Sequence, residues 1–285
     1  MDADLDTLCI AVYCTADDLL PARPANARRI VSDAELVTLA VAQAIMGIPS
    51  DRRFLTAARR LGHLFPRRPG QAGYHKRRRA LAEAIEWLIG VFADQSPGAG
   101  EDLLLIDSTP VECARSRETV KRSALGEAAD YGYCQSHSRF FWGLRLHAIF
   151  ACDGTPRALC LASPKRDERE VGLELLARVR RRGGEILLAD KGSAGRAFAA
   201  GVDALGATLV RPARRDEPGQ GPHLAPIRQR IESIFLTCKD LLTLERHGAR
   251  TRPGCASGAP SASCAWRHAS GSTISSGDRA ARSWP

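Results

Sequence analysis

The pattern of hydrophobic and polar positions changes once along the chain, near residue 97, and this change predicts two domains of different class. Up to that point apolar residues recur at helical spacing without convincing alternation, which predicts a small all-helical domain over 1–97. Ser32 followed by Glu35 has the pattern of a capping box, and Gly47 ends the predicted helix. The apolar residues of this helix are Leu36, Leu39, Ala40 and Ile45.

A strongly basic segment comes later in the same half. Between Arg52 and Arg79 the chain has ten Lys and Arg residues and no acidic residue, and the segment ends in the run Lys76, Arg77, Arg78, Arg79. The run leads into a further predicted helix with Leu81, Ile85, Leu88 and Phe92. A solvated charged face is the usual reason for a charge run, but two successive basic helices favour contact with DNA phosphates.

Beyond Ser96-Pro97-Gly98, which we interpret as a linker, short apolar runs predict strands. A turn signal at Asp153-Gly154 predicts that the second and third of them form an antiparallel hairpin. The order of elements predicts a mixed α/β domain over 98–250. The elements are strands at 103–106, 141–150 and 158–161, a helix at 167–182, a strand at 186–189, a short helix, a strand at 208–210 and a helix at 227–244.

The last segment, 251–285, has a different composition. It is rich in Ser, Ala, Gly, Arg and Pro and contains no Leu, Val, Phe or Met, so it cannot contribute a packed element of the preceding kind. We interpret it as a disordered tail. A frameshift in a GC-rich gene is a hypothesis for its origin, and a shifted reading frame that encodes no apolar helix would contradict it.

The overall charge points to a polyanionic partner. The 285 residues carry a formal net charge of +9, and the isoelectric point is about 9.4. No stretch approaches the roughly 18 apolar residues of a membrane span, and the N-terminus is acidic, so we expect a cytoplasmic protein without a membrane partner. The nine cysteines form no C-x-x-C pair and are expected to be free thiols, which sets aside zinc at Cys134 and His137.

Two aspartates occupy equivalent positions in the pattern. Asp107 and Asp190 each follow four apolar residues directly, so both are expected where a buried strand ends. Ligand sites of α/β sheets lie beyond strand ends, and carboxylates suit divalent metal ions. A single aspartate at such a position more often only caps a turn, so each is a weak signal by itself.

Glu232 in the final predicted helix is the third candidate acid. Arg228 and Lys239 lie within roughly 40° of it around a helix, so that two cations and one acid share a face. Such a pattern alone is typical of a surface ion pair. Two other acids are left outside the site, because Asp153 fits the hairpin turn and Glu112 lacks an evident partner. We interpret His147 as a structural residue of a strand face.

Several strings in the chain resemble bacterial insertion-sequence transposases of the DDE class. The resemblance covers about Leu5 to Arg250 and includes the phrase Leu244-Glu245-Arg246-His247-Gly248. The strings that carry it are Ile106-Asp107-Ser108-Thr109-Pro110-Val111-Glu112, Trp142-Gly143-Leu144-Arg145-Leu146-His147, Leu188-Ala189-Asp190-Lys191-Gly192 and Arg230-Ile231-Glu232-Ser233.

The resemblance implies a ribonuclease-H-like mixed sheet with flanking helices, preceded by the small helical domain. In this fold three antiparallel strands precede helix, strand, helix, strand and helix, which is the order that the hydrophobic pattern predicts. The resemblance also implies that Asp107, Asp190 and Glu232 are catalytic and bind two Mg²⁺ ions, for which Mn²⁺ can substitute.

The final helix also matches a signature of many such transposases, Y-x-x-R-x-x-x-E-x-x-x-x-x-x-K. Arg228, Glu232 and Lys239 match it, while Ala225 occupies the tyrosine position and puts one DNA contact in doubt. Further candidates to line a DNA channel are Lys191, Arg211 and Arg214.

The activity implied is that of a transposase on double-stranded DNA. It would cut the inverted-repeat ends of a transposon and join the exposed 3′-hydroxyl to target DNA, as a homodimer associated with the bacterial nucleoid. Two alternatives stay open at this point. One is a metal-dependent nuclease on the same fold that never joins DNA, and the other is an inactive DNA-binding remnant.

Overall fold

The computed structural model describes residues 4–22, 30–134, 138–179, 183–214, 224–240, 242 and 244. The chain divides into two compact units, one formed by Met1–Gln95 with the chain from Thr237 onward and the other by Ser96–Leu236. The predicted tail over 251–285 lies outside the described residues, as does His137.

The described part of the first unit is helical up to Gln95. Its second helix confirms the capping box, because Ser32 Oγ accepts from the Glu35 amide at 3.0 Å and Glu35 Oε2 accepts from the Ser32 amide at 2.6 Å. Gly47, with φ of 64°, follows the end of this helix. The elements are α1 (Leu5–Leu19), α2 (Asp33–Ile45), α3 (Asp51–Ala57), η1 (Ala58–Leu61), α4 (Gln71–Ala80) and α5 (Ala82–Asp94).

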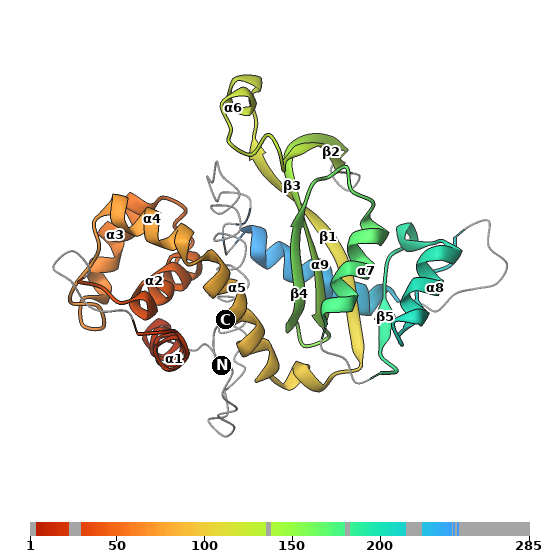
Figure 1. The fold of residues 1–285 in the computed structure, drawn as a ribbon, viewed down its shortest axis with the longest axis horizontal. Coiled ribbons are helices and arrows are strands. Elements are labelled where there is room, and N and C mark those ends of the chain that lie inside the picture. The colour runs from red at the N-terminus through yellow and green to blue at the C-terminus, as the bar shows by residue number, and fades with distance from the viewer. Residues whose placement is uncertain are drawn as a thin grey trace. The chain divides into compact units, whose positions relative to one another are not determined.

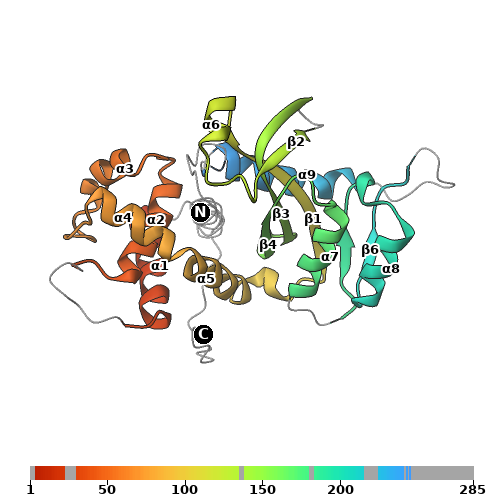
Figure 2. The same cartoon turned by 45° about the horizontal axis from the view of Figure 1, so that its top comes forward.

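The second unit contains one mixed sheet, drawn in Figures 1 and 2. The strands follow the order β2-β3-β1-β5-β6, and β4 also pairs with β3. Strand β3 pairs antiparallel with β1 and with β4, whereas β5 pairs parallel with β1 and with β6. The strands are β1 (Leu103–Ala114), β2 (Asp130–Cys134), β3 (Arg139–Ala151), β4 (Pro156–Ala162), β5 (Ile186–Leu188) and β6 (Thr208–Val210).

Helices cover both faces of this sheet, as Figures 1 and 2 show for α7 and α9. Neighbouring residues of β3 point to opposite faces. Ile149 packs in the core with Val171 and Leu175 of α7, whereas the Phe150 ring meets that of Phe235 on α9 edge-on at 5.8 Å between centroids. The remaining elements are η2 (Pro97–Gly100), α6 (Arg117–Lys121), α7 (Glu168–Arg178), η4 (Lys191–Ser193), α8 (Arg196–Ala204) and α9 (Ala225–Asp240).

The sequence pattern missed part of the sheet. Strand β1 continues to Ala114, beyond the predicted end at Ile106, because its polar second half still pairs with β3. Strand β2 and the short helix α6 were not predicted at all. β2 pairs with β3 over Arg139–Gly143, and β4 pairs with β3 over Arg145–Phe150, so the two strands follow one another along one edge of β3.

The predicted linker at Ser96–Gly98 is instead a packed turn. Gly98 is buried, and its amide donates to Asp153 Oδ2 at 3.0 Å, while Ser96 Oγ bonds to Thr155 Oγ1 at 2.9 Å. A β-carbon on Gly98 would lie 2.3 Å from Asp153 Oδ1. Asp153 therefore serves the predicted hairpin turn and also anchors the start of the second unit.

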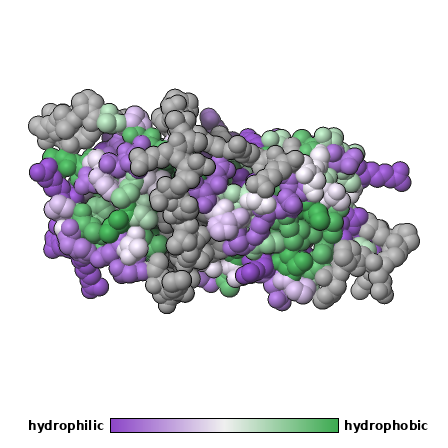
Figure 3. All heavy atoms as spheres, turned by 90° about the horizontal axis from the view of Figure 1, so that it is seen from below, coloured by the Kyte–Doolittle hydropathy of each residue, from purple (hydrophilic) through white to green (hydrophobic). Residues whose placement is uncertain are grey.

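No helix in the described part of the chain is long and apolar enough to span a membrane. Figure 3 shows hydrophilic and hydrophobic residues interspersed over the face that is seen from below. Seven cysteines lie in the described ranges, and none of these seven forms a disulfide.

Candidate active site

Asp107 lies in the middle of β1, opposite Ala148 of β3, and not at a strand end as predicted. The parallel neighbour β5 does end here, since its last residue Leu188 pairs with Leu105. Asp107 and Asp190 each stand two residues beyond this pair, and β1 and β5 run in the same direction. The two aspartates therefore emerge at the same level of the sheet, at the carboxyl end of β5.

The Asp107 carboxylate faces α9. Its neighbour Ile106 packs against the core under α7, and successive side chains of a strand point to opposite faces. The carboxylate Oδ1 accepts from the Ser108 amide at 2.7 Å. Three elements of the second unit thus carry the candidate acids, namely β1 with Asp107, the segment after β5 with Asp190 and α9 with Glu232.

The pKa of Asp107 responds to the charges of the other groups around it. Burial above all, together with the negative charges of Asp190 and Glu232, raises the pKa of Asp107 to about 6. The Ser108 amide and the Arg228 guanidinium act in the opposite direction and lower this pKa. Asp107 thus lies in a local excess of negative charge, which is the environment that attracts a cation.

Asp190 is held by the turn that follows it. It caps the short helix η4, where its Oδ1 accepts from the Ser193 amide at 3.0 Å and from Ser193 Oγ at 2.9 Å. A β-carbon on Gly192 would lie 3.0 Å from Asp190 Oδ2. The glycine therefore leaves room for the second carboxylate oxygen, Oδ2.

Glu232 is exposed on α9. Arg228, one turn earlier, is half-buried and acts on Asp107, so the structure brings both residues to the aspartates. The helix continues to Asp240, which retains the predicted spacing to Lys239. Lys239 is not among the charges that act on Asp107, and it falls in the part of the chain that groups with the first unit.

The donor chemistry of the three acids fits a hard divalent cation, because carboxylate oxygens are the ligands that such ions prefer. Repulsion between them, which adds to the effect of burial on the pKa of Asp107, is what a bound cation would relieve. Among the described residues, however, no three His, Cys, Asp or Glu side chains lie close enough together to hold a metal ion. Joint coordination therefore requires the carboxylates to approach one another.

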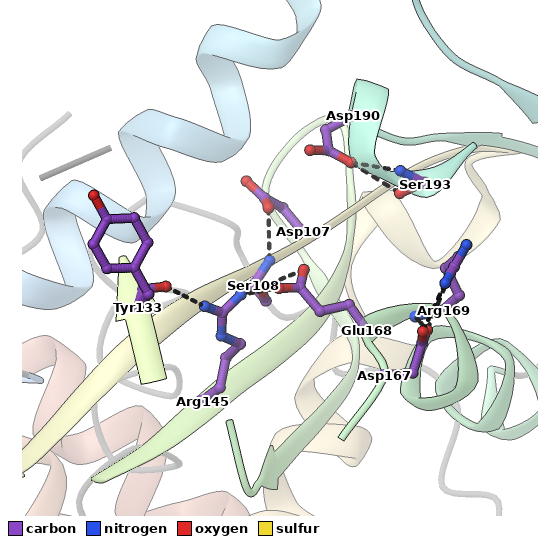
Figure 4. Close-up of polar contacts among 9 residues, drawn as sticks. All are labelled: Asp107, Ser108, Tyr133, Arg145, Asp167, Glu168, Arg169, Asp190 and Ser193. Carbon is purple, nitrogen blue, oxygen red and sulfur yellow. Dashed lines mark hydrogen bonds and ion pairs between the residues drawn. The ribbon is translucent and has the colours of Figure 1, made fainter. Parts of the chain in front are cut away.

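A second polar network supports β1 from the opposite face, and it was not predicted. Arg145 on β3 forms an ion pair with Glu168 at the start of α7, and both contact Ser108 Oγ, Arg145 at 3.3 Å and Glu168 at 3.1 Å. Arg145 also donates to the Tyr133 carbonyl at 3.2 Å. Figure 4 shows this network beside Asp107. The sequence does contain a sign of this network, because Arg145 is a charged residue within an otherwise apolar predicted strand.

The segment after Asp190 is tied to the same helix. Asp167 caps α7 and pairs with Arg169 at 2.7 Å, and Arg169 also donates to the Ala194 carbonyl at 3.2 Å. The hydrogen bonds from Arg169 lower the pKa of Asp167 to about 2. Helix α7 therefore supports both strands that carry the aspartates, through Glu168 on one side and Arg169 on the other.

Comparison with known protein families matches residues 98–256, more than half of the chain, to the transposase DDE domain. The chain belongs to this family. The mixed sheet with flanking helices is the ribonuclease-H-like architecture expected for a DDE transposase, and transposases of this family use divalent metal ions and act on DNA. No curated protein and no solved structure matches the chain.

The basic residues predicted to line a DNA channel in the transposase domain lie near the second aspartate. Lys191 follows Asp190 directly and is exposed, and its carbonyl accepts from exposed Arg214 at 3.1 Å. Arg211 is half-buried and donates to the Pro212 carbonyl at 3.1 Å. Lys191 and Arg214 are thus both exposed beside the site, while DNA contact by all three stays a prediction.

The four basic residues 76–79 of α4, in the N-terminal unit, have different roles. Arg77 pairs with Asp33 at 2.5 Å, and Arg78 contacts Gln43 at 2.9 Å and Asp51 at 3.1 Å. These two guanidinium groups hold helices together, with acids that stand before the basic segment in the sequence. Lys76 is exposed and Arg79 half-buried. Among the four predicted DNA contacts, Lys76 is the residue most accessible to a phosphate.

Glu112 and His147, which were also set aside from the sequence, have structural surroundings that the sequence did not reveal. Glu112 pairs with Arg139 at 3.2 Å and with Arg115 at 3.6 Å, so it is a structural acid at the far end of β1. His147 is buried on β3, and its burial, with the nearby Arg145 and Arg166, lowers its pKa to about 4. The imidazole is therefore neutral near pH 7.

Proposed function

We propose that this DDE transposase cuts the ends of a transposon and joins the released 3′-hydroxyl to target DNA, with Asp107, Asp190 and Glu232 as the catalytic carboxylates. The observation that carries the proposal is their convergence. Two parallel strands place the aspartates at one level, and the charges of Asp190 and Glu232 both act on Asp107. This convergence occurs within the family-matched part of the chain.

We infer two Mg²⁺ ions as the cofactor, with Mn²⁺ able to substitute. Ions held by the three carboxylates would activate the attacking oxygen and stabilise the leaving oxygen of an in-line displacement. The chain's own groups do the positioning. The Ser108 amide fixes one Asp107 oxygen, Ser193 fixes one Asp190 oxygen, and Arg228 supplies a positive charge beside Asp107 that can bind a substrate phosphate.

The same active site suffices for cutting and joining, because both steps displace an oxygen at phosphorus. In cutting, the nucleophile is water, and in joining it is the 3′-hydroxyl. No external energy source is needed, since one phosphodiester bond is exchanged for another. We further propose that Lys191, Arg211, Arg214, Lys239 and Lys76 contact double-stranded DNA, that the enzyme acts as a homodimer on two transposon ends, and that it works in the bacterial cytoplasm at the nucleoid.

The test uses the full chain with the DNA that flanks its gene. Labelled fragments carrying these flanks are incubated with Mg²⁺, and cleaved and joined products are separated on denaturing gels. Asp190→Asn and Glu232→Gln should each abolish cleavage while leaving DNA binding intact. Glu127→Gln, a change at an exposed acid of the same unit, is the matched control and should cleave like the wild type.

The products also separate the two alternatives. A nuclease on the same fold would cut the flanks without ever producing joined strands. An inactive remnant would bind DNA and leave it uncut with either Mg²⁺ or Mn²⁺. Cleavage that persists in Asp190→Asn would refute the assignment of the carboxylates.

A further inference from the structure

Both residues that flank Asp107 on β1 contact helix α7. Ser108 Oγ donates to Glu168 Oε2 at 3.1 Å. Ile106 packs in the core under α7, where a β-carbon on Gly172 would lie only 3.0 Å from Ile106 Cδ1. Because neighbouring side chains of a strand point to opposite faces, α7 contacts β1 on the face opposite to the Asp107 carboxylate. Figure 4 shows Glu168 reaching Ser108 while the carboxylate of Asp107 points away from Glu168.

The spacing of these two contacts matches on the helix and on the strand. Glu168 and Gly172 are four residues apart on α7, which is about 6 Å along a helix axis. Ile106 and Ser108 are two residues apart on β1, which is about 6.6 Å along a strand. One polar and one apolar contact thus fix β1 against the first turn and a half of α7, with Asp107 between them.

The next residue of α7, Arg169, holds the segment that carries Asp190. Its Nη1 donates to the Ala194 carbonyl at 3.2 Å, and a β-carbon on Gly195 would lie 3.4 Å from the same nitrogen. Ala194 directly follows Ser193, whose amide and hydroxyl both donate to Asp190 Oδ1. One short turn of chain therefore connects Arg169 to the carboxylate of Asp190.

The exposure of these side chains argues against a role in stability alone. Glu168 is 54% exposed and Arg169 46%, and ion pairs of exposed side chains contribute little to stability. A similar pair lies nearby, between Arg166, 40% exposed, and Glu174, 46% exposed. In the described part of the chain this second pair bonds to neither aspartate segment. The two sets of charges therefore differ in what they hold.

We propose that the first turn of α7 positions Asp107 and Asp190 for a shared divalent cation, with Glu168 acting through Ser108 and Arg169 acting through Ala194. The proposal rests on the proposed function, because it takes the aspartates as metal ligands. Adjacent residues of one helical turn fix the two segments relative to each other. Segments that are ordered in advance lose less conformational freedom when the ion binds, which raises the affinity. The approach that joint coordination still requires is left to the carboxylate side chains.

The experiment measures the affinity for Mn²⁺ in the full chain without DNA. Free Mn²⁺ is followed by electron paramagnetic resonance during a titration. Glu168→Ala and Arg169→Met should each weaken Mn²⁺ binding about 10-fold or more, since residues that orient metal ligands typically have effects of this size. Glu174→Ala and Arg166→Met are the matched controls, because they change the same residue types at similar exposure, and both should bind Mn²⁺ like the wild type.

The route through Ser108 has its own test. Ser108→Ala should reproduce the loss seen in Glu168→Ala, and the double variant should lose no more than either single change, because the two residues act in series. Ser108→Thr retains a hydroxyl and should retain the affinity. If Glu168→Ala does not fold because the largely buried Arg145 loses its carboxylate, Ser108→Ala decides the matter, since it leaves that ion pair in place.

Two results would overturn the positioning roles while leaving the carboxylate assignment intact. One is wild-type Mn²⁺ affinity in folded Ser108→Ala and Arg169→Met although Asp107→Asn loses the ion. The other is a lower unfolding midpoint in EDTA for these two variants without any change in Mn²⁺ affinity, which would make the contacts structural only. Additive losses in the double variant would exclude the route through Ser108. Asp107→Asn that binds Mn²⁺ like the wild type would overturn both the positioning roles and the carboxylate assignment.

Discussion

Replacing Asp107 by Asn should make the metal-free protein more stable at neutral pH. The carboxyl has an ordinary pKa of 3.8 and a pKa of about 6 in the folded chain. The folded state therefore disfavours the ionised form. The difference, at 1.36 kcal/mol for each pKa unit, corresponds to a cost of about 3 kcal/mol as an upper limit.

Because the pKa of Asp107 is raised on folding, the gain in stability should appear only above the ordinary pKa of the carboxyl. Below about pH 4 the carboxyl is protonated in both states, and Asp107→Asn should have little effect on the free energy of unfolding. Between about pH 4 and pH 6 the ionisation cost develops, and above pH 6 it is fully present. The variant should thus gain stability relative to the wild type through this window, and the amide oxygen can still accept from the Ser108 amide.

The assay is thermal unfolding in EDTA at pH 4, 5, 6 and 8. Each kcal/mol should raise the midpoint by roughly 2–4 °C for a protein of this size class. Asp203→Asn, at an exposed position on α8, is the control and should give equal midpoints at every pH. Added Mg²⁺ should stabilise the wild type more than Asp107→Asn, because the ion binds the native carboxylates. A variant that is no more stable than the wild type at pH 8 would refute the reasoning.

Three further changes test other parts of the structure. Gly143→Ala places a β-carbon 2.2 Å from the Val111 carbonyl oxygen, so urea unfolding should show a loss of about 1–3 kcal/mol, and an unchanged midpoint would contradict the close approach of β1 and β3. Ser193→Ala removes a hydrogen bond to Asp190 and should slow Mg²⁺-dependent cleavage roughly 10- to 100-fold at unchanged DNA affinity. A variant that cleaves at the wild-type rate would show that this hydrogen bond does not position the carboxylate. Arg77→Met should lower the free energy of unfolding by roughly 1–3 kcal/mol. Lys76→Met should change it by no more than about 0.5 kcal/mol and should weaken DNA binding. A larger loss of stability in Lys76→Met than in Arg77→Met would exclude the roles assigned to these residues of α4.

Local patterns in the sequence predicted the elements that depend on local interactions. The capping box at Ser32 and the hairpin turn at Asp153 were both predicted, and both are present with the expected bonds. Each involves groups only two or three residues apart, so the sequence contains the whole interaction. The apolar runs likewise predicted the antiparallel hairpin and the two strands that follow it.

Interactions between distant residues could not be predicted in this way. Strand β2 has exposed aromatic residues and depends on pairing with β3, so it carries no apolar run. The predicted linker is a packed turn because Asp153, 55 residues away, accepts a hydrogen bond from the Gly98 amide. The basic run of α4 contained no acid, yet Arg77 found its partner in Asp33, 44 residues earlier.

The candidate site likewise has features that the sequence determines and features that depend on the fold. The sequence by itself determined which residues are acids, that Asp107 and Asp190 follow apolar runs, and that Arg228 and Glu232 share a helix face, because these are properties of order and helical period. Only the tertiary structure decided that Asp107 lies mid-strand, that Asp190 and Glu232 act on its charge, and that Arg145 connects Ser108 to Tyr133. Proximity of groups from separate elements is set by strand pairing and helix packing, and no local stretch of the chain encodes it.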